Sequence, residues 1–213
     1  AMLIDGKKIA AETRAEISEA VAAQKAAGVT PGLAVIIVGE NPASQVYVRN
    51  KGKACEEVGI YSEIIRMPEE TTEETLLAKI DELNARNEIS GILVQLPLPK
   101  HISEEKVIAA ISPEKDVDAF HPVNVGGIMT GDYSFLPCTP AGVMQMLKHY
   151  DIQTAGKHCH LRMRDSGRAT GRANTAHYAV ERFFSALLEI ASLSISYVLH
   201  NIKFLSTSLC TSV

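Results

Sequence analysis

The sequence predicts an α/β fold in which a three-layer, mainly parallel sheet forms the amino-terminal domain. Apolar segments at 33–39, 61–66 and 91–96 have the length and composition of strands. Stretches with helical periodicity separate these segments, so strand and helix alternate along the chain. Such alternation favours right-handed crossovers, a parallel sheet and helices on both of its faces.

The first helix is expected over 4–27, where apolar residues recur at approximately helical spacing and Gly28 ends the run. The strand at 33–39 follows, and it is apolar throughout, which is typical of a buried parallel strand. A second helix is then expected at about 44–58, closed by Gly59.

The remaining elements continue the pattern. Thr71 or Thr72 can cap a third helix that runs to about residue 87, because Thr71 and Glu74 have the spacing of a capping box. Shorter helices are expected at 103–111 and 139–150, and the last of these is predicted to lead away from the first domain.

Composition excludes several classes of protein. The chain has 213 residues, 46% of them hydrophobic, and a net charge of −4 with acids and bases interspersed, so neither nucleic acid nor a membrane surface is an expected partner. The uncharged run at 190–202 is thirteen residues long, short of the ~20 needed to span a bilayer. It is expected to belong to a carboxy-terminal amphipathic helix.

The cysteines indicate a reducing compartment. Cys55, Cys138, Cys159 and Cys210 show no Cys-x-x-Cys spacing, so we expect reduced, buried thiols and a cytoplasmic protein. The consecutive residues 158–160, His-Cys-His, cannot all face one side of a strand, so no metal site is predicted.

The most informative stretch is the start of the second helix. Tyr47 and Lys51 are four residues apart and Ser44 lies one turn earlier, so the three side chains share nearly one helical face. This helix begins at the carboxyl end of a predicted strand, where open α/β sheets bind ligands. A phenol beside an ammonium suits a flat ligand and proton transfer, although an ordinary amphipathic helix explains the same spacing.

Two further segments can converge on this helix. Gln95 ends the third strand, just before Pro97-Leu98-Pro99, and its amide can bond the Lys51 ammonium, a ligand or the adjacent loop. Asp116 and Asp118 lie in a predicted loop, where one carboxylate can face a pocket while the other caps. A carboxylate suits a ligand edge with adjacent N–H donors, but a solvated acidic turn is the alternative.

Taken in order, these segments resemble the bifunctional methylenetetrahydrofolate dehydrogenase/methenyltetrahydrofolate cyclohydrolase family. The resemblance covers about residues 2–159, and no single motif in it would be specific. The motifs that carry it are Tyr-Val-Arg-Asn-Lys at 47–51, Gly-Ile-Leu-Val-Gln-Leu-Pro-Leu-Pro at 91–99, Lys-Asp-Val-Asp at 115–118 with Phe-His-Pro at 120–122, and Pro-Cys-Thr-Pro at 137–140.

The resemblance implies an enzyme of one-carbon folate metabolism. It would oxidise 5,10-methylenetetrahydrofolate with NADP and hydrolyse the methenyl product to 10-formyltetrahydrofolate. Lys51 is implied as the proton-transfer residue with Gln95 tuning it, Tyr47 would lie against the aminobenzoate, and Asp118 would bind the pterin.

The implied substrate site has further members. Ser44, Pro97 and Leu98 are expected beside the folate, and a homodimer is the family expectation. Ala119 departs from the glycine usual in the family, and the added Cβ is expected to restrict that loop.

The chain is predicted to divide into a folate-binding catalytic domain at 1–140 and, at 141–213, a linker helix with an altered, incomplete nucleotide-binding region. The family's Gly-Arg-Ser-x-x-Val-Gly-x-Pro phosphate loop, part of a Rossmann-like domain, is missing from this second part. Only Thr139 and Arg168 are candidate contacts for NADP. The likeness stops abruptly near Cys159, which we interpret as a change of reading frame.

Two alternatives belong to other classes. A chain without a working NADP site would be a catalytically impaired remnant that binds folate or forms complexes. A short-chain dehydrogenase could use Tyr47 and Lys51 as its Tyr-x-x-x-Lys pair, but that family has a glycine-rich loop near its amino terminus. Residues 1–32 contain none.

Overall fold

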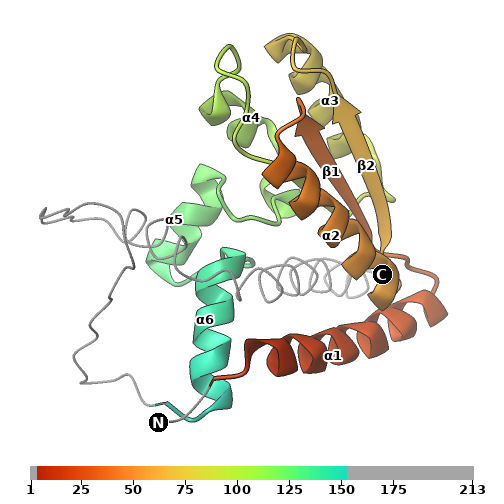
Figure 1. Cartoon of the computed structure of the whole chain (residues 1–213), viewed down its shortest axis with the longest axis vertical. Coiled ribbons are helices and arrows are strands. Elements are labelled where there is room, and N and C mark those ends of the chain that lie inside the picture. The colour runs from red at the N-terminus through yellow and green to blue at the C-terminus, as the bar shows by residue number, and fades with distance from the viewer. Residues whose placement is uncertain (1–3, 153–213) are drawn as a thin grey trace, which may run out of the picture.

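The computed structural model describes residues 4–152, and these form the predicted α/β fold (Figure 1). Three parallel strands lie in the order β2-β1-β3. The strands are β1 (Gly32–Val38), β2 (Tyr61–Met67) and β3 (Gly91–Val94). The helices are α1 (Gly6–Ala26), α2 (Pro42–Val58), α3 (Glu73–Ala85), α4 (Glu104–Ala110), the 3-10 helix η1 (Pro113–Lys115), α5 (Pro122–Thr130) and α6 (Cys138–His149).

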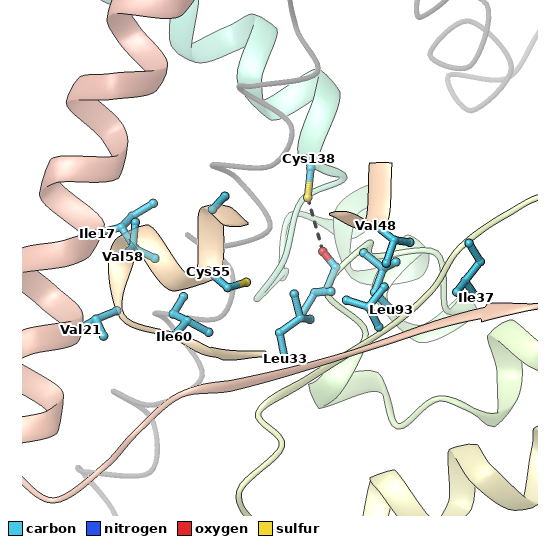
Figure 2. Packing of buried hydrophobic residues seen from close by; sticks show 13 residues of the cluster. Ile17, Val21, Leu33, Ile37, Val48, Cys55, Val58, Ile60, Leu93 and Cys138 are labelled. Atoms are coloured by element: carbon cyan, nitrogen blue, oxygen red, sulfur yellow. Dashed lines mark hydrogen bonds between the residues drawn. The ribbon is translucent and has the colours of Figure 1, made fainter. Parts of the chain in front are cut away.

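β1 is the central strand, and its alternate side chains enter two separate apolar clusters. Leu33, Val35 and Ile37 pack with α1 and α2 on one face (Figure 2), which also receives Leu93 from β3. The opposite face packs against α3, α4 and the turn after β3, through a cluster that includes Ala34, Ile36, Val38, Leu76, Ile80, Leu83, Ile92, Leu98 and Val107. All seven residues of β1 are buried, as expected for a parallel strand covered on both faces.

Local sequence explains where α2 and α3 begin and end. The Asn41 side chain accepts hydrogen bonds from the first turn of α2, and Gly59 ends that helix in the left-handed conformation, at φ 82°. Thr72 caps α3 by accepting from the amide of Thr75. The capping box predicted for Thr71 is therefore wrong, because the Thr71 hydroxyl instead donates to the Pro68 carbonyl.

The third strand is shorter than predicted, because only residues 91–94 pair with β1. Beyond them the amide of Gln95 donates to the Ile36 carbonyl at 2.8 Å, and the chain then turns at Pro97. A parallel bridge from Ile92 to Asp116 adds one further residue pair at this edge of the sheet.

The helix α5 was not predicted, since 115–122 was expected to be a loop and no element was assigned between that loop and the helix expected at 139–150. His121 caps this helix through Nδ1, which accepts from the Val123 amide, and Pro122 occupies its first turn. None of its side chains is buried. Without a buried face it shows no apolar stripe that periodicity could reveal.

The helix α6 was predicted to lead away from the first domain, but it lies against the start of α1 (Figure 1). Ile9 of α1 packs against the partly buried side chains of Val143, Met146 and Tyr150. The Asp5 amide donates to the Tyr150 hydroxyl at 2.9 Å, so the contact joins residues 145 positions apart.

Within residues 4–152, no helix is long and apolar enough to cross a membrane, and no group of three potential metal ligands is present. Cys55 and Cys138 are buried, as predicted, and neither forms a disulfide within these residues. The other two cysteines, the segment 158–160, Arg168 and the expected carboxy-terminal helix lie outside the described residues.

Candidate active site

The site begins with Lys51, whose side chain α2 directs toward the sheet. The residues of α2 at 44, 48, 51 and 55 are all buried and form one stripe along the helix. Only 8% of Lys51 is exposed and only 6% of Ser44, so a polar pair lies on a face that is otherwise apolar. A buried ammonium needs a partner, because desolvation of a charge is costly.

Gln95 supplies that partner from the end of β3. Lys51 Nζ donates to Gln95 Oε1 at 3.4 Å, and Gln95 Nε2 donates to the Leu96 carbonyl at 2.7 Å. The second bond orients the amide so that its oxygen faces the ammonium. Of the three partners expected for Gln95, the structure shows two, the Lys51 ammonium and the loop that follows the strand.

Tyr47 lies beside this pair at the rim of the site. Its side chain is 42% exposed, although it shares a helical face with the buried Lys51. An exposed phenol ring next to a buried amine offers a flat apolar surface at the edge of a polar group. This arrangement suits an aromatic ligand that is partly open to solvent.

Asp118 reaches the same region from the segment after η1. The carboxylate is half-buried, and burial raises its pKa above the ordinary value of 3.8. The positive charge of Lys51 acts in the opposite direction and lowers that pKa, while the nearby charge of Asp116 raises it. The amine and the carboxylate, 67 positions apart in sequence, therefore lie close enough for the charge of Lys51 to act on Asp118.

The two carboxylates of this segment differ in their hydrogen bonds. Asp116 is 3% exposed, and its Oδ2 accepts from the amide of His121 at 2.7 Å and from Asn124 Nδ2 at 2.9 Å, so it is the capping carboxylate. Asp118 makes neither of these bonds, but both carboxylates line a small cavity at the edge of β3, so facing a cavity does not distinguish them. That cavity offers about 10 Å³ to a water-sized sphere, the space of one water, so it holds no ligand ring.

Cys138, the first residue of α6, is a member of the site that sequence reasoning assigned only to the core. Its Sγ–H donates to the Val117 carbonyl at 3.6 Å (Figure 2). Burial raises the pKa of this thiol well above its ordinary value, and the charge of Asp118 raises it further. A neutral thiol therefore ties α6 to the segment that carries Asp118. The motif at 137–140 was the only signal that could have found it.

Cys55 lies one turn beyond Lys51 on the same stripe of α2. Burial raises the pKa of its thiol to about 11, against a smaller lowering by the charge of Lys51. It therefore stays protonated at neutral pH and fills the core as a small apolar group.

The remaining predicted residues are more scattered. Pro97 is exposed in the turn after Gln95, next to the site. Leu98 points into the apolar cluster beneath α3 and α4, away from Lys51, because residues of this turn alternate between the two faces of the sheet. Thr139 is half-buried in the first turn of α6, and Arg168 lies outside the described residues.

Comparison with known proteins agrees with this geometry. The protein-family model for the catalytic domain of tetrahydrofolate dehydrogenase/cyclohydrolase matches residues 4–118, just over half of the chain. The chain is 56% identical over 158 residues to the bifunctional protein FolD of Bacillus cereus (strain G9842), covering 74% of this chain and 55% of that protein. The chain thus spans about half the length of the curated relatives that it matches.

Solved structures of such enzymes superpose on it as well. The bifunctional FolD methylenetetrahydrofolate dehydrogenase/cyclohydrolase of Campylobacter jejuni is 50% identical, with a TM-score of 0.70 over 71% of this chain and 54% of that one. The Trypanosoma brucei enzyme, whose structure was solved with NADP and an inhibitor, is 37% identical. Its TM-score is 0.70, and the match covers 74% of this chain and 54% of that one. The family match over the residues that bring Lys51, Gln95 and Asp118 together shows that the chain belongs to the tetrahydrofolate dehydrogenase/cyclohydrolase family.

Proposed function

We propose that the protein interconverts 5,10-methylene-, 5,10-methenyl- and 10-formyltetrahydrofolate, as an NADP-dependent methylenetetrahydrofolate dehydrogenase and a methenyltetrahydrofolate cyclohydrolase. One observation carries the proposal. A buried lysine is held by a glutamine at the carboxyl edge of the sheet, and its charge acts on the carboxyl of Asp118. The activities named for its relatives support the same assignment.

The proposed substrate spans the rim and the edge of the site. The exposed ring of Tyr47 would lie against the aminobenzoate, with Ser44 and Pro97 beside it. Asp118 would accept from the amino group and ring N–H of the pterin, since a carboxylate accepts two parallel hydrogen bonds. Leu98 would support the turn after β3 from the core rather than touch the ligand.

Lys51 would carry the proton transfers. In the cyclohydrolase step, the oxygen of a water bonds to the methenyl carbon and one proton is released. The bond from that carbon to N5 then breaks as N5 takes up a proton, and the new hydroxyl loses its proton to become the formyl carbonyl on N10. Lys51 Nζ would move these protons, and Gln95, which accepts a hydrogen bond from it, would hold it in position.

NADP would supply the hydride acceptor for the dehydrogenase step. Across residues 4–152, no turn between a strand and a helix has the glycine-rich spacing that holds dinucleotide phosphates. Thr139 is the one predicted contact within this range. The part of the chain that the structure describes therefore does not form an NADP site by itself, and we derive no step through the cofactor.

Lys51→Met tests the proposal in an assay that needs no NADP. Hydrolysis of 5,10-methenyltetrahydrofolate is followed by its absorbance, and we expect kcat to fall by about 10²- to 10⁴-fold, the usual contribution of a general acid–base group. Lys53→Met is the matched control, because Lys53 is an exposed lysine on the same helix. Its activity should stay within about two-fold of the unmodified chain, as for a surface charge.

Two results would contradict the proposal. One is full hydrolysis by the Lys51→Met protein, and the other is no turnover by the unmodified chain. Oxidation of 5,10-methylenetetrahydrofolate, followed by NADPH formation, tests the dehydrogenase activity separately.

We also propose that the protein acts in the cytoplasm as a homodimer. Cys55 and Cys138 are buried thiols that form no disulfide, which supports a reducing compartment, and the dimer is what the family resemblance implies. Sedimentation velocity of the full chain would test the dimer, which a single monomeric species at micromolar concentration would exclude.

A further inference from the structure

Asp116 is a buried carboxylate that the proposed chemistry does not use. We propose that it is a positioning residue, which holds the loop carrying Asp118 in place at the carboxyl edge of β3. The inference rests on the proposed function, because Asp118 is the residue assigned there to the pterin. The geometry that supports it joins three parts of the molecule: the sheet, the loop and α5.

The first link is to the sheet. Asp116 forms a parallel bridge with Ile92 of β3, so its backbone is fixed at the sheet edge. It is also the point from which the next residues, including Asp118, leave the sheet.

The second link closes the loop around Asp118. The main-chain carbonyl of Asp116 accepts from the Ala119 amide at 3.1 Å, and its side-chain Oδ2 accepts from the His121 amide at 2.7 Å. One residue thus bonds the chain just after Asp118 and again two residues further on. Asp118 has little freedom to move while both bonds persist.

The third link is to α5. Asn124 Nδ2 donates to Asp116 Oδ2 at 2.9 Å and also to the Pro113 carbonyl at 2.9 Å. A single carboxylate oxygen therefore accepts two hydrogen bonds, one from the amide of the residue that caps α5 and one from a side chain in the first turn of α5. Only 3% of Asp116 is exposed. Removing its carboxylate would therefore leave two buried N–H donors without an acceptor, because water has little access to them.

Loss of these bonds should act on the ligand site through Asp118. A misplacement of about 1 Å by a change away from the chemistry can lower a rate by about 10²-fold. The expected signature is weaker folate binding that parallels the loss in Asp118→Ala.

Asn84 provides a matched control. It is a half-buried amide that also makes two bonds to main-chain groups near this loop, donating to the Ala110 carbonyl at 2.8 Å and accepting from the Ser112 amide at 3.0 Å. It has no bond to Asp116. Asn84→Ala should therefore lower the melting temperature without a specific effect on the ligand site.

The experiment is titration calorimetry of the full chain with tetrahydrofolate. Asp116→Ala should raise Kd by about ten-fold or more, as loss of a buried charged acceptor predicts. Asp116→Asn keeps an acceptor oxygen in the same place, so its Kd should stay within about three-fold. Asn84→Ala should stay within about two-fold of the unmodified chain, because it breaks no bond to the loop of Asp118.

A second pair of variants tests the positioning role of Asp116 if Asp116→Ala fails to fold. Asn124→Asp places two carboxylates face to face and should weaken binding as Asp116→Ala does. Adding Asp116→Asn to Asn124→Asp restores a donor–acceptor pair, with the amide now at position 116, and should recover most of the affinity. A role in stability alone predicts that the melting temperature changes while the Kd of each folded variant does not.

The possible failures are distinguishable. If the unmodified chain binds tetrahydrofolate and Asp118→Ala does not, but Asp116→Ala and Asn124→Asp bind normally, the positioning role is overturned and the proposed function stands. Equal losses in Asn84→Ala and Asp116→Ala would also overturn the role. No binding by the unmodified chain would overturn both.

Discussion

Ala119 adopts a backbone conformation that favours glycine. Its φ is +57°, in the left-handed region, and the residue is fully buried next to Asp118. A Cβ in this region costs roughly 1–2 kcal/mol. The family resemblance predicted that the Cβ of Ala119 restricts this loop, because the family usually has glycine here. The positive φ is the physical reason.

Ala119→Gly should therefore stabilise the protein. We expect the free energy of unfolding to rise by about 0.5–1 kcal/mol, after the entropy that glycine gains in the unfolded chain is subtracted. Urea denaturation measures this. Ala54→Gly, within α2, is the control and should lower the same quantity by about 1 kcal/mol. A loss of stability in Ala119→Gly would mean that packing of its Cβ outweighs the backbone strain.

Asp118 makes stability depend on pH with a defined sign. Its folded pKa lies above the ordinary value of 3.8, so between these two pKa values the folded state binds more protons than the unfolded state. Stability contributed by this group is therefore present at low pH and is lost as the pH rises through that window. The cost of its charged form remains at neutral pH.

Asp118→Asn removes that cost. We expect a higher melting temperature than the unmodified chain at pH 7, a smaller difference at pH 3.5, and weaker folate binding at both. Thermal unfolding across this pH range, with calorimetry for the ligand, measures all three. A lower melting temperature at pH 7 would show that the attraction between Lys51 and Asp118 outweighs burial of the carboxylate.

At the scale of elements, α5 contains two adjacent glycines that differ in the space available for a side chain. A Cβ at Gly127 would lie 2.4 Å from the Asp132 carbonyl oxygen, whereas a Cβ at Gly126 would meet nothing within 4 Å. The Asp132 amide also donates to the Gly127 carbonyl at 2.9 Å. The turn after α5 therefore folds closely back onto the helix at one of the two positions.

Replacing each glycine by alanine should separate these effects. Gly126→Ala should stabilise by about 0.5–1 kcal/mol, the gain in helix propensity at an open position. Gly127→Ala should destabilise by about 1–3 kcal/mol, because backbone atoms must shift to relieve the overlap. Chemical denaturation of both variants measures the pair, and similar effects at the two sites would contradict the predicted packing of the turn.

The order of elements was accessible from sequence because each depends on nearby residues. Apolar runs predicted the strands, and helical spacing with the closing Gly59 predicted α2. The helix α5 was missed because its stability depends on contacts from elsewhere in the chain. Its cap belongs to His121, but its first turn is bonded to Asp116 at the sheet edge.

At the scale of the whole molecule, the contact between α1 and α6 joins the two ends of the described chain. The Asp5 amide at the start of α1 donates to the hydroxyl of Tyr150, and His149 Nδ1 lies 3.7 Å from Glu12 Oε2. Figure 1 shows α6 rising from the start of α1 toward α5. Since Cys138 at the other end of α6 bonds the segment of Asp118, this helix links the amino terminus to the site.

Tyr150→Phe tests that link. It removes one acceptor for an exposed amide, so we expect a loss of about 0.5–1 kcal/mol in the free energy of unfolding. Hydrogen exchange should accelerate in α6 more than in the strands, since β1 is buried on both faces. Unchanged exchange in α6 would show that the helix is held by its apolar contacts alone.

The sequence by itself determined the alternation of strand and helix, the reactive face of α2, and the residues that define the family. These depend on local periodicity, on capping groups and on motif order. Only the tertiary structure decided which of two carboxylates caps, that Leu98 belongs to the core, and that α6 returns to α1. Those outcomes depend on contacts between residues far apart in the chain, whose geometry is set by packing and by burial of charge.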